Sequence, residues 1–198
     1  MTFSTVRVDR VRDPAATPTS DPGARLVDAA RTLADETGSA GFTVAQVARH
    51  AGTSLKAFYR TFAGKDDLLV ALLAAESVRG AVVLEARIAA DPADPLAAYV
   101  EGIFELVSLP EARGYARVLA QEHRRLAQTR PDELDAALAP LTDLLAGITG
   151  DGRDARTVFA LLLSGIHDVT LGRADAHDTG RYLAAFVRRA LGRDGGGR

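Results

Sequence analysis

The sequence predicts an all-α protein of about nine helices, and three features of its 198 residues support this fold class. Apolar residues recur at the three- and four-residue spacing of amphipathic helices almost throughout the chain. No segment shows the alternating Val, Ile and Thr pattern that is typical of strands. Gly, Pro and Asp-Pro pairs separate the apolar segments and mark where helices begin and end.

The first helices have clear start signals. Asp21 is a suitable N-cap and Pro22 suits the first helical position, so a helix is expected from residue 22 to near Gly38. Thr43 and Gln46 form a capping box that starts a second, short helix.

The later helices follow from the same kinds of signal. Ser54 can cap a third short helix over 55–62, and a long helix over 65–90 opens with acidic residues, which the helix dipole favours. The remaining expected helices run from Pro95 to about 109, onward from Pro110, from Pro131 to 145, through 158–171 and over 178–191, with a loop at 147–152.

The composition fits a folded protein and excludes several kinds of site. Hydrophobic residues make up 47% of the chain, which is long enough to bury a core without disulfides or metals. There is no Cys, so thiol nucleophiles and Cys-ligated metal sites are excluded. The longest apolar run, 68–75, is too short to cross a membrane, and the N-terminus lacks the apolar segment of a signal peptide. We therefore expect a cytoplasmic protein without membrane contact.

Residues 43–62 have the spacing of a helix-turn-helix, in which two short helices pack across a tight turn. Ala48 is small enough for a close helix crossing, and Gly52 suits a turn that needs a positive φ. Val47 and Phe58 provide an apolar core for the unit. This spacing alone could also arise by chance in an Ala-rich helical protein.

The same segment concentrates positive charge. Arg49, Lys56, Arg60 and Lys65 lie between residues 37 and 65, where no acidic residue occurs, although the whole chain has a net charge of −2. A protein without an overall positive field needs such a local patch to bind nucleic acid. DNA binding is therefore the leading interpretation of this segment.

Residues 29–69 resemble the DNA-binding domain of TetR-type transcriptional regulators. This resemblance covers about a quarter of the chain, and the remainder agrees with the family only in architecture. The matching positions are Ala29-Ala30, Gly38, Gly41-Phe42-Thr43-Val44, Val47-Ala48, Ala51-Gly52, Ser54, Phe58-Tyr59-x-x-Phe62, and Lys65 with Leu68-Leu69.

The resemblance implies roles for individual side chains. Thr43 and Tyr59 would bind phosphates, Lys65 would pair with another phosphate, and the face over 54–61 would enter the major groove. The candidate DNA-binding residues are Thr43, Ser54, Lys56, Ala57, Tyr59, Arg60, Thr61 and Lys65.

Three positions of the motif depart from the family pattern. The family commonly has a hydrophobic residue at Thr53, a small residue at Lys56 and Thr at Ala57. The base-contacting surface is therefore individual, and the operator sequence does not follow from the resemblance. Lys56 is the leading candidate to read a guanine edge, although Lys56 and Arg60 are equally able to bind phosphate.

The resemblance also implies the domain organisation. We expect a flexible tail over 1–20, a three-helix DNA-binding domain over 21–80, a larger helical domain over 81–191 that binds an effector and dimerises, and a flexible tail over 192–198. The last two helices would pair with their copies in a homodimer, unless they only form core. A two-fold dimer predicts an inverted-repeat operator.

An effector pocket in the larger domain would be apolar with a few polar groups. The best candidates to line it are Tyr99, Phe104, Tyr115, His123 and His167. Each of the two His residues could instead be a hydrogen-bonded interior side chain.

The sequence contains no catalytic motif of the HExxH, GxSxG, Walker A or GxGxxG type. Histidines that adjoin acidic residues in sequence point about 100° away from them on a helix and cannot form a ligand pair. We therefore expect no enzyme activity, cofactor or metal site. The resemblance implies a repressor that an unknown small effector releases from double-stranded DNA. The alternatives are an interaction protein with a degenerate DNA-binding domain, and a helical enzyme or ligand carrier without a DNA role.

Overall fold

The computed structural model describes residues 21–110 and 112–192 and folds this part of the chain into nine helices without a strand, which confirms the all-α class. The tail expected over 1–20, and the other one beyond Gly192, lie outside the described residues. The helices are α1 (Pro22–Thr37), α2 (Val44–His50), α3 (Leu55–Thr61), α4 (Lys65–Ala90), α5 (Pro95–Ser108), α6 (Arg113–Thr129), α7 (Pro131–Thr149), α8 (Gly152–Thr170) and α9 (Ala176–Ala190).

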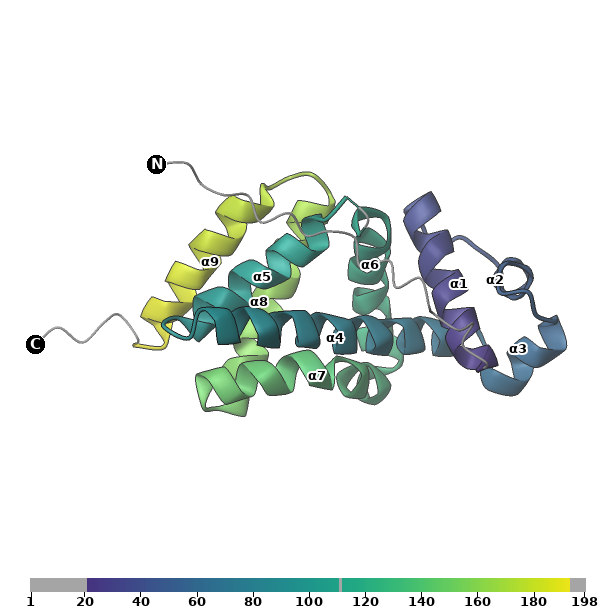
Figure 1. The fold of residues 1–198 in the computed structure, drawn as a ribbon, viewed down its shortest axis with the longest axis horizontal. Coiled ribbons are helices and arrows are strands. Elements are labelled where there is room, and N and C mark those ends of the chain that lie inside the picture. The colour runs from purple at the N-terminus through teal and green to yellow at the C-terminus, as the bar shows by residue number, and fades with distance from the viewer. Residues whose placement is uncertain (1–20, 111, 193–198) are drawn as a thin grey trace, which may run out of the picture.

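Helices α1–α3 form a small unit at one end of the molecule (Figure 1). Asp21 starts α1 by accepting hydrogen bonds from the backbone N–H groups of Gly23 and Ala24, at 3.0 and 3.2 Å. At α2 the predicted capping box is present, because Thr43 Oγ1 accepts from the Gln46 N–H and Gln46 Oε1 accepts from the Thr43 N–H. Both helices therefore start where their local sequence predicts.

A tight turn between α2 and α3 sets the geometry of the helix-turn-helix. Gly52 has a φ of 62°, in the left-handed region that favours glycine. The Thr53 N–H donates to the Ala48 carbonyl at 2.9 Å and closes the turn. Val47 is fully buried, as is Phe58 of α3, so the two short helices share one apolar core.

Helix α4 runs from the small unit along the larger helical body (Figure 1). The domain boundary expected at residue 80 falls inside this helix, which continues without a break from Lys65 to Ala90. Buried side chains of both parts belong to one continuous hydrophobic cluster. The two parts are therefore joined by a helix and by shared packing, not by a linker.

Helices α5–α9 complete the larger body. Helix α4 packs against α5 and α7, while α5 packs along α9 and also contacts α8. Phe104 of α5 lies at the centre, where Gly165 and Gly180 allow α8 and α9 to approach closely. A Cβ at Gly165 would lie 2.8 Å from Phe104 Cζ. The size of the Phe104 ring thus fixes the spacing of three helices.

Three helices begin at positions that differ from the sequence expectation, and among them α8 starts at Gly152 rather than at residue 158. Helix α6 starts at Arg113, because Pro110 lies in a turn that the Ala112 N–H closes by donating to the Leu109 carbonyl at 2.8 Å. Helix α9 starts at Ala176, two residues early, because Asp175 is its N-cap.

The loop expected over 147–152 is shorter in the structure. Helix α7 continues through Gly147 and ends before Gly150, whose φ of 78° terminates it in the left-handed conformation. Asp151 then caps α8 by accepting from the N–H groups of its first turn. Gly147 thus lies inside the last turn of α7, where a glycine is compatible with helix as well as with loop.

Candidate nucleic-acid interface and ligand cavity

The exposed face of α3 is the candidate nucleic-acid interface. Lys56, Tyr59 and Arg60 are exposed on it, and Tyr59 is 55% exposed. Phe58 points into the core, and its ring packs edge-to-face against Tyr59 with 5.3 Å between the ring centroids. The buried ring anchors the helix and leaves the Tyr59 hydroxyl accessible to a phosphate.

The other candidate residues of this interface differ in what they can offer. Ser54 Oγ accepts from the Ala57 N–H at 3.1 Å, which leaves the Ser54 O–H available as a donor. Thr43 and Thr61 donate their hydroxyl hydrogens within the domain, to Gln46 Oε1 at 3.0 Å and to the Ala57 carbonyl at 3.2 Å. Ala57 itself is half-buried and has no polar side-chain atom.

Lys65 has partners inside the molecule. Its ammonium group donates to the Ala40 carbonyl and lies 4.9 Å from the centroid of the Phe42 ring. Both contacts fasten the loop before α2 to the start of α4. The phosphate contact that the family resemblance implies for Lys65 would have to compete with them.

The segment that forms α2 and α3 is positively charged because it contains no acidic side chain. Arg49 and His50 are exposed at the end of α2, and no carboxylate occurs between residues 38 and 64. Asp66 and Asp67 come next in the chain, and each is bound by an arginine from the larger body. The positive charge of α2 and α3 is therefore not offset by a free carboxylate in the adjoining turn.

Two arginines hold the start of α4. Arg125 of α6 binds Asp66 with two hydrogen bonds, at 2.6 and 3.0 Å, and Arg130 binds Asp67. Hydrogen bonds from these arginines keep the pKa of each aspartate below its ordinary value. The end of α6 is thereby joined to α4, the helix that follows the small unit of α1–α3.

The other end of α6 touches α1 directly. Gly114, in its first turn, lies so close to the Asp35 backbone that a Cβ would come within 2.7 Å of the Asp35 Cα. Helix α6 therefore contacts the small unit at α1, and it also contacts the start of α4, the helix that follows this unit.

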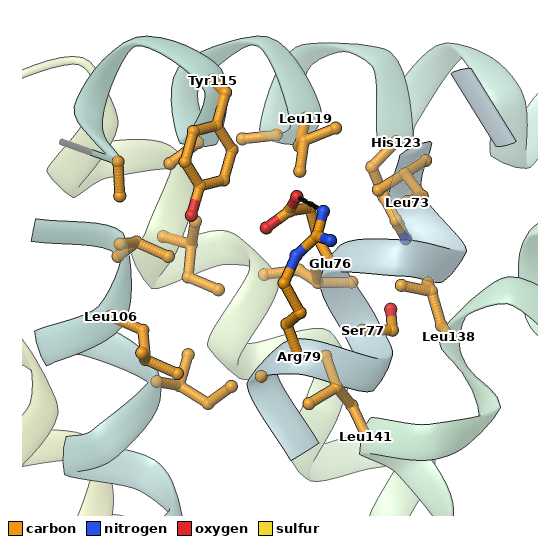
Figure 2. A pocket seen from close by; sticks show the side chains of 18 of the residues that line it. Leu73, Glu76, Ser77, Arg79, Leu106, Tyr115, Leu119, His123, Leu138 and Leu141 are labelled. Carbon is orange, nitrogen blue, oxygen red and sulfur yellow. Dashed lines mark hydrogen bonds and ion pairs between the residues drawn. The ribbon is translucent and has the colours of Figure 1, made fainter. Parts of the chain in front are cut away.

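A cavity of about 350 Å³ lies between α4, α5, α6, α7 and α8 (Figure 2). Its size and apolar wall are those of a small-molecule site. The apolar side chains of the wall include Leu73, Val83, Ile103, Leu106, Leu119, Leu138, Leu141, Phe159, Leu163 and Ile166.

Three charged side chains meet at this cavity. The Glu76 side chain is only 12% exposed, and its Oε1 atom lies 3.1 Å from Arg31 Nε and accepts a hydrogen bond from Arg79. Figure 2 shows Glu76 and Arg79 meeting in the space that faces Tyr115 and His123 of α6. Arg31 comes from α1, so the small unit of α1–α3 contributes directly to the wall.

Burial changes the titration of the two aromatic polar residues in the wall. Burial raises the pKa of Tyr115, whose ring lies 4.7 Å from the Arg31 guanidinium carbon. Burial lowers the pKa of His123 from 6.5, although the charge of Asp135 partly opposes this effect. His123 is therefore a neutral imidazole at pH 7 that can donate or accept a hydrogen bond.

Only two of the five residues predicted for the pocket line this cavity. Tyr115 and His123 do so, whereas Tyr99, Phe104 and His167 do not. Tyr99 is fully buried and donates to the Leu141 carbonyl at 3.0 Å, and Phe104 fills the core between α5, α8 and α9.

The sequence analysis missed the charged residues of the cavity, Arg31, Glu76 and Arg79. One signal was available on α4, where Glu76 and Ser77 interrupt an apolar stripe that includes Leu73 and continues at helical spacing to Gly80. Ser77 is 2% exposed, so this polar interruption faces inward. Leu55, which is 43% exposed at the start of α3, was also not singled out.

Helices α8 and α9 each expose large apolar side chains. Leu161, Tyr182 and Phe186 are 37%, 64% and 40% exposed. The rings of Tyr182 and Phe186 stack with 6.3 Å between their centroids. Exposed aromatic side chains gathered on packed helices are typical of a protein interface.

Comparison with known proteins identifies the N-terminal unit. Residues 26–72 match the sequence model of the family described as bacterial regulatory proteins, tetR family. The match extends from α1 through the helix-turn-helix into α4. No curated protein matches the chain in sequence. None of the described helices is long and apolar enough to cross a membrane.

Solved structures share the fold of nearly the whole chain. A transcriptional regulator FadR from Bacillus subtilis, in complex with stearoyl-CoA, is 18% identical, with a TM-score of 0.68 over 83% of this chain and 96% of the other. A TetR transcriptional regulator from Rhodococcus sp. RHA1 is 22% identical, with a TM-score of 0.67 over 86% and 94%. RolR in complex with resorcinol is 22% identical, with a TM-score of 0.65 over 87% and 88%. The chain thus has a TetR-like fold.

Proposed function

We propose that this chain, a TetR-family protein by its DNA-binding domain and its fold, is a homodimeric transcriptional repressor that a small effector releases from DNA. The observation that carries the proposal is the exposed face of α3. It presents Lys56, Tyr59 and Arg60 on a helix-turn-helix surface that lacks carboxylates. Such a surface supplies the cationic and hydroxyl donors that phosphates and base edges need.

The exposed apolar side chains of α8 and α9 support a two-fold dimer. An isologous contact would bury Leu161, Tyr182 and Phe186 of both copies, and two packed helices from each copy suit a four-helix arrangement. The dimer would present two α3 helices to successive major grooves of an inverted repeat.

The position of α6 supports control by a ligand. This helix lines the cavity with Tyr115, Leu119 and His123, and it contacts the DNA-binding unit through Gly114 and Arg125. A ligand that displaces α6 would therefore shift α1 and the start of α4, and with them the spacing of the two α3 helices. RolR and FadR, which share this fold, are recorded with small ligands bound, and this agrees with a ligand role for the cavity.

The experiment that tests the function is selection of binding sites from random duplex DNA at a fixed salt concentration. An inverted repeat is the expected product. Lys56→Ala should weaken binding to it and reduce the salt slope by about 1 if this residue binds phosphate. Arg173→Ala is the matched control, because Arg173 is an exposed arginine of the larger body. Recovery of no preferred sequence would contradict the proposal.

A further inference from the structure

We infer that the effector is an amphipathic organic anion, with an acid group that binds Arg79 and an apolar body that fills the cavity between α4 and α8. The word effector rests on the proposed function, because it assumes that the ligand regulates DNA binding. The charge of the ligand is argued from the cavity alone.

The first observation is an excess of positive charge in the cavity wall. Among the lining residues the fixed charges are two guanidinium groups, of Arg31 and Arg79, and one carboxylate, of Glu76. The apolar wall around them has a low effective dielectric, which strengthens the attraction of the excess charge for an anion. A ligand with one negative charge would neutralise the site, whereas a cation would double its excess charge.

The second observation is that the two arginines share one acceptor. Within the described residues the only ion pairs of Arg31 and Arg79 are with Glu76, and both reach the same oxygen, Oε1. Each guanidinium has five N–H donors in a fork that fits a carboxylate in two-fold contact. One shared oxygen leaves most of these donors without a protein acceptor of opposite charge, so Arg79 can bind a second carboxylate.

The third observation concerns access. The Arg79 side chain is 46% exposed, and Val83 and Leu109, which also line the cavity, are 50% and 41% exposed. Solvent therefore reaches one cationic and two apolar side chains of the lining. Other lining side chains are buried, since Leu73 and Leu138 are 5% and 8% exposed, so an acid group would stay at the exposed Arg79 while an apolar chain packs against these leucines.

Three probes with the same chain and different head groups test the inference: decanoate, decanol and decylamine. Their affinities are measured by titration calorimetry on the full chain without DNA, below micellar concentrations. Because a hydrogen bond to a charged group adds appreciably to binding, decanoate should bind about 10- to 100-fold more tightly than decanol. Decylamine should bind most weakly.

Two variants separate the contribution of charge to probe binding from the contribution of the apolar chain. Arg79→Met keeps the length and apolar part of the side chain, and it should lower the affinity for decanoate to that for decanol. Glu76→Gln removes the competing carboxylate and should raise the affinity for decanoate. Arg173→Met is the control, because Arg173 is an exposed arginine outside the cavity. It should change neither the affinity for decanoate nor the affinity for decanol.

The outcomes distinguish this inference from the proposed function. Tightest binding of decylamine, equal binding of all three probes, no binding of any, or unchanged decanoate binding by Arg79→Met overturns the anionic ligand. If Arg79→Met does not fold, the affinity of Glu76→Gln for decanoate decides: a rise supports the anionic ligand, and a fall overturns it. If the protein stays bound to the selected operator while decanoate occupies the cavity, release of the operator by this ligand is contradicted. Tighter binding of decanoate than of decanol would still support the anionic site.

Discussion

Replacement of Gly114 by alanine tests how α6 is joined to the DNA-binding unit. In the structure a Cβ at this position would lie 2.7 Å from both the Cα and the carbonyl carbon of Asp35, and closer still to its oxygen. These neighbours are backbone atoms of α1, so no change of side-chain rotamer can relieve the clash. To accommodate the alanine, α1 and α6 must move apart, or one of them must bend.

The cost of Gly114→Ala follows from this geometry. Ordinary contacts to a Cβ begin at 3.4 Å, so the two carbon contacts at 2.7 Å alone require the backbones to separate by about 0.7 Å, and the nearer Asp35 oxygen requires a larger separation. Overpacking of this kind costs about 1–3 kcal/mol, while alanine recovers about 0.5–1 kcal/mol through its higher helix propensity. We expect a net loss of about 1–2 kcal/mol, in the free energy of unfolding or as a 5- to 30-fold loss of operator affinity.

The assay combines urea unfolding with titration of the selected operator. Gly147→Ala is the matched control, because it also replaces a helical glycine and its Cβ would have no neighbour within 4 Å. This control should be as stable as the original chain or more stable by up to about 1 kcal/mol, with unchanged operator affinity. If Gly114→Ala behaves like Gly147→Ala in both measurements, the close contact between α1 and α6 does not exist as described.

Three further predictions concern the DNA interface, the dimer and pH. Tyr59→Phe should lower operator affinity about tenfold through loss of a hydrogen bond to a charged phosphate, and an unchanged titration would count against this contact. Phe186→Glu should convert the dimer to a monomer in analytical ultracentrifugation, because it places a charge among the exposed apolar side chains of α8 and α9; a persisting dimer would assign the interface elsewhere. Burial lowers the pKa of His123 from 6.5 in the folded state, so the unfolded chain takes up the proton first as the pH falls. Stability should therefore decrease below pH 6.5, and His123→Gln should reduce this decrease in urea unfolding at several pH values.

Elements with local causes can be placed from the sequence alone. Asp21 and the Thr43–Gln46 capping box start helices through hydrogen bonds that span no more than three residues. Gly52 closes the helix-turn-helix for an equally local reason, since only its own φ is involved. The exposed cations on α3 also followed from the sequence, because helical spacing places them opposite the buried Phe58.

Local patterns were ambiguous where a residue type suits two structures. The sequence predicts a loop at Gly147, but in the structure Gly147 continues α7, and of Gly147 and Gly150 it is Gly150 that has the left-handed conformation. Tyr99 and Tyr115 are both aromatic residues on apolar helix faces. Periodicity indicates that such a side chain faces inward, and it does not tell whether a neighbouring helix fills the space in front of it.

The tertiary structure alone decided the contacts that the proposed regulation depends on. Arg125 meets Asp66 across 59 positions of sequence, and Lys65 reaches the Ala40 carbonyl across 25. The meeting of Arg31 with Glu76 likewise depends on how α1 crosses α4. Such contacts depend on the rotation and offset of whole helices, which the summed packing of many side chains sets and no short sequence pattern encodes.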